Sequence, residues 1–191
     1  LTHYVWEFTS NTWAARGAWD SVLVAYDHWA EADRRAAKDP GVLPLMYQAA
    51  VAGAWLGGLD TGRAAARRAP AVEYLLSVPP GSSAAKKQAA RVAWADGMLA
   101  LLRRDLHGLA QARLQLRQVE GITAEFSERS LAGLELELRG SKEAAAESLA
   151  ALDLAATDSI VGEPHDPYTR SITHLAASRL MLEQGDTTRA V

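Results

Sequence analysis

The chain has 191 residues, of which 49% are hydrophobic and 23% charged, and it contains no cysteine. This composition excludes a disordered chain, disulfide bonds, thiol catalysis and cysteine-ligated zinc. The formal net charge of -3 gives no reason to expect direct nucleic-acid binding, because phosphate backbones select basic surfaces. No apolar run approaches the roughly 20 residues that span a bilayer, and no secretory signal stands at the start. We therefore expect a cytoplasmic protein without a membrane partner.

Helical segments separated by short breaks predict five helical hairpins. Their approximate bounds are 1–38, 41–78, 82–119, 122–157 and 166–191. Apolar residues recur at helical spacing in each segment, as in Val22, Tyr26 and Trp29. Residues 134–138 alternate like a strand, but their flanks are helical and Leu and Glu are good helix formers, so we expect a helix there. Pro70 should kink or end the second helix of the second hairpin, because proline lacks the amide hydrogen that a helix needs.

Five positions of the chain repeat one pattern around a turn between two helices. The turn positions are Gly17, Leu59, Arg104, Gly140 and Gly185. A small residue precedes each of them by seven positions: Ser10, Ala52, Gly97, Gly133 and Ser178. A small or aliphatic residue follows each by five positions: Val22, Ala64, Leu109, Ala145 and Ala190. A small residue lets the backbone of a neighbouring helix approach closely, so each unit is expected to stack on the next.

The residues that follow four of these turns can cap the next helix. They are Asp60, Asp105, Ser141 and Asp186, whose short oxygen-bearing side chains accept hydrogen bonds from exposed backbone amides. In the first hairpin Ala18 takes this place, and Asp20 is the alternative start of the helix.

The pattern of a small residue, a bulky residue, a Gly-Asp turn and then Ala resembles the tetratricopeptide repeat. It is clearest in residues 182–190 (LEQGDTTRA) and 93–99 (AWADGML), and the resemblance covers nearly the whole chain. The turns lie 36 to 45 residues apart, whereas a standard unit has about 34 residues and HEAT-type units are longer. The resemblance implies an all-α, right-handed α-α superhelix whose concave face binds a peptide or protein segment. Longer units also resemble the repeat arrays of bacterial signalling proteins, including kinases and transcription activators.

The resemblance places one set of candidate binding residues on the concave face. They are Arg91, Trp94, Met98, Leu134, Glu137 and Arg179. Trp94 and Met98, with a cation beside them, form an adaptable apolar surface of the kind enriched at interfaces. The alternative is that both side chains pack between adjacent hairpins.

The sequence carries no enzyme signature and implies no cofactor. Glu163, His165, Asp166 and His174 form the densest group of possible metal ligands, but the two histidines lack the four-residue spacing of one helical face. A capped loop with an exposed histidine explains this group without a metal. His28 and His107 have no nucleophile at a meaningful spacing.

Aromatic and basic residues cluster in ways that allow two interpretations each. Trp6, Trp13, Trp19 and Trp29 fall in the first hairpin, where they either stiffen it from inside or mark a docking face. Three arginine pairs lie near expected helix ends: Arg34 and Arg35, Arg67 and Arg68, Arg103 and Arg104. They are either solvated faces or a basic strip for an acidic partner.

Our first hypothesis is a non-catalytic scaffold that binds a protein or peptide, as the sensory or assembly region of a larger signalling protein. The second is part of an enzyme: a helical toroid with carboxylate and imidazole groups at the ends of its inner helices, or a regulatory array whose catalytic or DNA-binding domain lies elsewhere. The chain begins at Leu1 and its last expected helix has barely begun at Asp186, so we expect a fragment of a longer protein.

Overall fold

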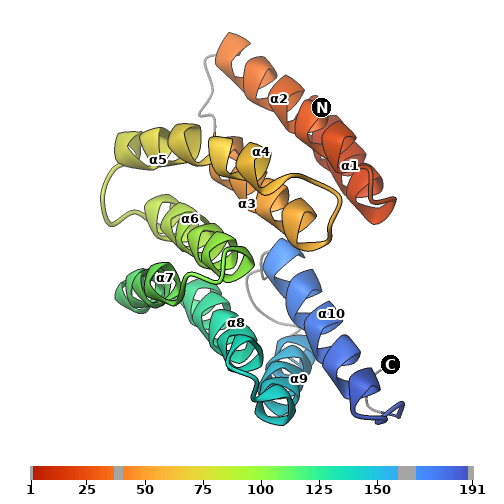
Figure 1. Cartoon of the computed structure of the whole chain (residues 1–191). Coiled ribbons are helices and arrows are strands. Elements are labelled where there is room, and N and C mark those ends of the chain that lie inside the picture. Colours follow the sequence, from red (N-terminus) through yellow and green to blue (C-terminus); the bar gives the residue numbers. More distant parts are fainter. Residues whose placement is uncertain (1, 37–40, 159–166, 189–191) are drawn as a thin grey trace.

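The computed structural model describes residues 2–36, 41–158 and 167–188, and these ranges are helical with no strand (Figure 1). The helices are α1 (Thr2–Ala15), α2 (Trp19–Arg35), α3 (Val42–Trp55), α4 (Thr61–Ala66), α5 (Arg68–Ser77), α6 (Ser83–Leu102), α7 (Leu106–Gln118), α8 (Ile122–Leu138), α9 (Lys142–Asp158) and α10 (Pro167–Glu183). The all-α class predicted from the sequence is confirmed, and residues 134–138 belong to α8 rather than to a strand.

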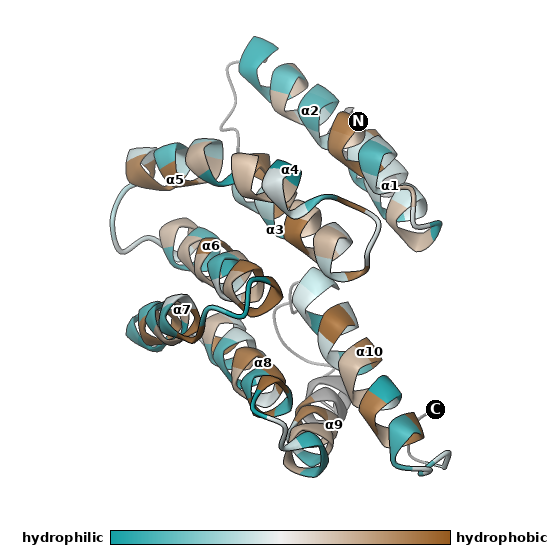
Figure 2. Cartoon of the chain, viewed as in Figure 1, coloured by the Kyte–Doolittle hydropathy of each residue, from teal (hydrophilic) through white to brown (hydrophobic). Residues whose placement is uncertain are grey.

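Neighbouring helices pack in pairs, and each pair packs on the next. α1 lies against α2, α6 against α7 and α8 against α9, while α4 and α5 return along α3. The first helices of three pairs, α3, α6 and α8, pack side by side in succession (Figure 1). α3 lies inside the molecule, and Gln48 is the one amide or charged side chain in its otherwise largely apolar sequence (Figure 2).

Positive φ angles occur at four of the five predicted turn positions. Gly17, Gly140 and Gly185 have φ of 69°, 86° and 80°, and Arg104 has φ of 56°. The prediction of Leu59 is wrong, because Gly57 takes the left-handed conformation in that loop, with φ of 76°. The loop is two residues longer than the others, and a side chain at Gly58 would overlap the Trp19 ring.

Asp60 and Asp105 act as helix caps, as the sequence predicts. Asp60 accepts hydrogen bonds from the amides of Gly62 and Arg63, at 2.8 and 3.1 Å. Asp105 accepts one from the amide of Gly108 at 2.9 Å. α2 begins at Trp19 with Ala18 as an N-cap that makes no side-chain hydrogen bond, so Asp20 does not start this helix.

Small residues allow close helix contacts both between successive hairpins and within one hairpin. A methyl group added at Gly97 of α6 would overlap Leu131 Cδ1 of α8. One added at Gly133 of α8 would lie 2.6 Å from Leu149 Cδ2 of α9. The residues five positions after the turns are fully buried wherever the structure describes them: Val22, Ala64, Leu109 and Ala145. Ala190 lies outside the described residues.

The second hairpin is interrupted as Pro70 predicts. α4 ends at Ala66 and α5 begins at Arg68. Proline cannot donate to the carbonyl four residues earlier and its ring clashes with that carbonyl, which for Pro70 belongs to Ala66. The break therefore falls at Arg67.

α10 reaches across the array to helices distant in the sequence. Its N-terminal half makes three hydrogen bonds between buried side chains: Tyr168 Oη with Tyr26 Oη of α2 at 2.8 Å, Thr169 Oγ1 from Gln48 Nε2 of α3 at 3.0 Å, and Thr173 Oγ1 with Ser130 Oγ of α8 at 2.7 Å. α10 also packs along α9. It thus ties the last hairpin to the first, second and fourth.

Candidate functional site

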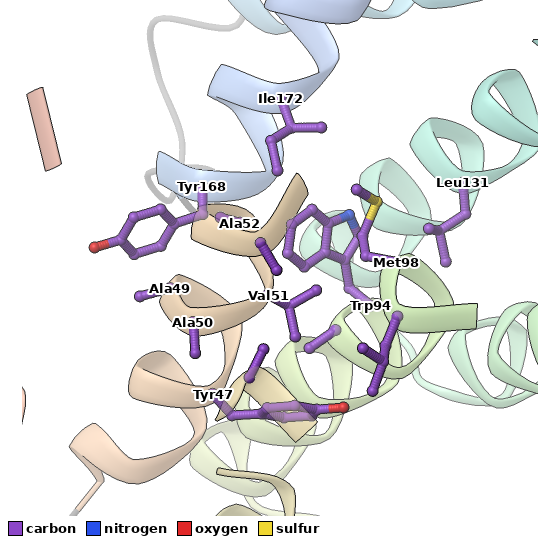
Figure 3. Close-up of a cluster of buried hydrophobic side chains, with 14 of the residues drawn as sticks. Tyr47, Ala49, Ala50, Val51, Ala52, Trp94, Met98, Leu131, Tyr168 and Ile172 are labelled. Atoms are coloured by element: carbon purple, nitrogen blue, oxygen red, sulfur yellow. The ribbon is translucent and has the colours of Figure 1, made fainter. Parts of the chain in front are cut away.

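The structure buries three of the predicted binding residues. Trp94 and Met98 are completely inaccessible, and Leu134 retains 4% of its exposure. Figure 3 shows Trp94 and Met98 directed toward Val51 of α3 and Ile172 of α10. Neither side chain faces solvent, so Trp94 and Met98 take the alternative position that the sequence allows, packed between neighbouring helices. Because α10 lies over α3 and α8, it covers the surface that these two side chains would otherwise present.

Two of the predicted residues meet and a third lies apart. Arg179 of α10 donates two hydrogen bonds to the Glu137 carboxylate of α8, at 2.7 and 2.8 Å. Burial alone would lower the pKa of Arg179, but its bonds to Glu137 and Glu183 raise that pKa, so the guanidinium keeps its charge. Arg91 instead donates to Gln88 on its own helix at 3.2 Å.

A hollow of about 250 Å³ opens beside this ion pair, where three inner helices end. We call it the cup. It is lined by Trp55 of α3, Leu101 and Leu102 of α6, Arg104 of the following turn, and Leu134, Glu137 and Leu138 of α8. Trp55, Leu101, Leu102 and Leu138 are each only half-buried. The cup therefore offers apolar walls to a side chain entering from solvent, with one acidic and one basic residue among them.

The turn that contains Arg104, at the rim of the cup, differs from the other turns of the array. Arg104 is exposed, and within the described part of the chain its side chain makes no ion pair or hydrogen bond. It is also the one residue other than glycine with positive φ in the described ranges. The left-handed conformation costs a residue with a side chain about 1 kcal/mol or more, and the corresponding turns use glycine. Residues kept in such conformations gather at functional sites.

Stabilisation of the helix end does not account for Arg104. A cation near a helix C-terminus contributes about 0.3–1 kcal/mol through the helix dipole. Arg103, at the C-cap of α6 with φ of -88°, already supplies that charge without backbone strain. The equivalent turns after α3 and α8 have glycine in the left-handed position, Gly57 and Gly140. A turn of this kind therefore does not require an arginine.

The tryptophans of the first hairpin differ in burial. Trp19 and Trp29 each retain 5% of their exposure and belong to the core. Trp6 and Trp13 are half-buried and line a second hollow, of about 320 Å³, on the α1–α2 hairpin.

Most of the paired arginines form salt bridges with carboxylates of this chain. Arg67 makes a two-bond contact with Asp27 of α2, at 2.7 and 2.9 Å, and Arg68 makes one with Asp96 of α6, at 2.8 and 2.9 Å. Arg34 and Arg35 both contact Glu31. A continuous basic strip is therefore absent from the described residues, and of these six arginines Arg104 is the one that lines the cup.

Three members of the proposed metal group, Glu163, His165 and Asp166, lie outside the described residues. His174 is exposed on α10, and His28 stacks on Trp6 with ring centroids 5.1 Å apart. Within residues 2–36, 41–158 and 167–188, no three His, Cys, Asp or Glu side chains are arranged to hold a metal ion.

Sequence reasoning missed the buried hydroxyl of Tyr47, which donates to Asp96 Oδ1 at 2.8 Å while Arg68 binds the same carboxylate. Burial raises the pKa of Tyr47, and the neighbouring Asp96 charge raises it further, so the phenol stays protonated. Nothing in the local pattern signals this contact, because the three residues come from α3, α5 and α6.

Comparison of the chain with models of protein families, with curated proteins and with solved structures finds no match. None of the helices in the described ranges has the length and apolar character of a membrane span. The site must therefore be interpreted from its own geometry.

Proposed function

We propose that the chain is a non-catalytic scaffold of the tetratricopeptide-like helical-repeat kind, and that its cup binds a segment of a partner protein. The partner inserts an apolar side chain between Trp55, Leu102 and Leu138, and an acidic residue near this anchor contacts Arg104. The half-exposed walls of the cup support the apolar anchor. The unpaired guanidinium at its rim supports the acidic neighbour, since charge-assisted hydrogen bonds are the stronger ones.

The conformation of Arg104 is the observation that carries this proposal. A turn that places a cation in the left-handed region loses stability relative to the glycine found elsewhere in the array. The Glu137 carboxylate, by contrast, already forms an ion pair with Arg179. It therefore does not need a cation from the partner.

A random-peptide library selected on the immobilised protein tests the proposal. We expect enriched peptides to carry a large apolar residue with Asp or Glu within two positions. Arg104→Gly should weaken their binding about tenfold, because a charged hydrogen bond contributes about 1.5 kcal/mol. Arg103→Gln is the matched control, since Arg103 does not line the cup, and it should leave the affinity unchanged.

Unchanged affinity of the selected peptides for Arg104→Gly would show that the cup is not the binding site. Arg104→Gly should also raise the free energy of unfolding by about 1 kcal/mol, so that weaker binding cannot be attributed to a damaged fold.

A further inference from the structure

The hollow on the α1–α2 hairpin has a composition different from that of the cup. Two helices line it: α1 contributes Trp6, Thr9 and Trp13 at helical spacing, and α2 contributes Asp20, Ser21, the apolar Val24 and Ala25, and His28. We call it the aromatic hollow. Thr9 and Ser21 are small, and the Thr9 hydroxyl donates to the Val5 carbonyl at 2.7 Å. The two indoles, two helical turns apart on one face of α1, therefore rise as walls above a low floor.

The electrostatics of the aromatic hollow favour a cation. The faces of indole rings are negative and attract guanidinium groups within about 6 Å of the ring centroid. The structure already shows this attraction at Trp13, because the Arg16 guanidinium carbon lies 5.7 Å from its ring centroid. The Asp20 carboxylate adds a formal negative charge at the edge of the hollow, with 70% of its side chain exposed.

The present partner of Asp20 is held loosely. Arg63 of α4 contacts Asp20 at 2.5 Å, but its own side chain is 57% exposed. Ion pairs this open to solvent contribute little, about 0–1 kcal/mol. A second guanidinium that also stacks on an indole would gain a contact that Arg63 does not make, and so would compete for the carboxylate.

We infer that the aromatic hollow binds an arginine side chain of a partner protein. The guanidinium stacks on an indole that already has one neighbour, His28 at Trp6 or Arg16 at Trp13, and forms a salt bridge with Asp20. Arginine fits better than lysine, because a planar guanidinium stacks on an indole and binds a carboxylate through two hydrogen bonds, whereas an ammonium is a compact, strongly hydrated charge. This site does not depend on the function proposed for the cup.

The test uses short acetylated peptides that differ in one residue: Gly-Gly-Arg-Gly-Gly, its lysine analogue and its citrulline analogue. Citrulline has the shape of arginine without the charge. Binding is followed through the indole amide signals of Trp6 and Trp13 in NMR spectra, assigned with Trp6→Phe and Trp13→Phe. The arginine peptide should shift both signals and bind at least about two- to fivefold more tightly than the citrulline peptide, which lacks both the cation–π contact and the salt bridge with Asp20.

Two surface variants should change this affinity in opposite directions. Asp20→Asn should weaken arginine-peptide binding about two- to fivefold, whereas Arg63→Gln should strengthen it by removing the competing cation. Arg35→Gln, which removes an exposed cation from the C-terminal end of α2, should have no effect. All three positions are exposed, so the fold is expected to survive each change.

Equal binding of the arginine and citrulline peptides would overturn the inference, since it would show an apolar hollow without preference for charge. So would identical responses of Asp20→Asn and Arg63→Gln. Concentration-dependent broadening of the Trp6 and Trp13 signals without peptide would also overturn it, by showing that a second copy of the chain covers the hollow.

Discussion

Replacement of Gly133 by alanine tests the close contact between α8 and α9. The added Cβ would lie 2.6 Å from Leu149 Cδ2 and 2.7 Å from Leu149 Cγ. Rotation of the Leu149 methyl groups moves Cδ2 but leaves Cγ in place, and Leu149 is completely buried. The helices must therefore separate or Leu149 must leave its favoured rotamer.

The expected magnitude combines two opposing effects. Overpacking of a core costs about 1–3 kcal/mol, while alanine gains about 1 kcal/mol over glycine within a helix. We expect Gly133→Ala to lower the free energy of unfolding by about 1 kcal/mol, as the difference between these effects. In the Leu149→Ala background the clash disappears and the new methyl group occupies part of the cavity. There the same substitution should stabilise the protein, so the sign of its effect reverses.

Urea unfolding of the four proteins of this double-mutant cycle measures the reversal. Gly97→Ala is the matched control, because Gly97 faces Leu131 and Ala112 rather than Leu149, and its effect should be the same with either residue at 149. If Gly133→Ala stabilised the wild-type protein as it would an open helix, the close approach of α8 and α9 would be refuted.

Three further predictions concern polar contacts between and within the hairpins. Tyr47→Phe should lower the free energy of unfolding by about 1–2 kcal/mol, because it removes a hydrogen bond to the charged Asp96; an unchanged urea midpoint would argue against that bond. Asp105→Ala should cost about 1 kcal/mol by removing the cap of α7, and circular dichroism melting would show no shift if the cap were absent. Burial opposes ionisation of Glu128, but the Arg113 and Arg117 guanidiniums lower its pKa below 4.5 overall. Its contribution to stability is therefore complete above about pH 4.5 and lost as the pH falls through the lower, folded-state pKa. Urea titrations from pH 6 to pH 3 should show a shallower loss in Glu128→Gln, and equal slopes would contradict the linkage.

The sequence predicted local features of the fold well because each depends on residues close in the chain. The left-handed turns at Gly17 and Gly140 and the helix break before Pro70 follow from backbone chemistry. The turn after α3 was misplaced at Leu59, because its position depends on a tertiary contact: the ring of Trp19 lies against Gly53 and Gly58. No spacing rule within the second hairpin contains that information.

The candidate site was predicted only in part for the same reason. Glu137 and Arg179 come together, but Trp94 and Met98 are buried where α10 crosses to α3. The crossing depends on contacts such as Gln48 with Thr169, which are 121 residues apart in the chain. The sequence pattern identifies Arg104 as a turn position and as one member of an arginine pair. A non-glycine residue at a position that favours glycine was the available signal that this turn has a special role.

Binding of a partner segment in the cup is tested most directly by NMR titration of the isotopically labelled protein with a library-selected peptide. The backbone amides of Leu102, Arg104 and Leu138 and the indole amide of Trp55 should shift together, and at a peptide concentration near the wild-type Kd these shifts should be several times smaller in Arg104→Gly, as a roughly tenfold weaker affinity requires. Shifts confined to α7 and α9, or shifts of the same size in Arg104→Gly as in the wild type, would contradict the proposed site.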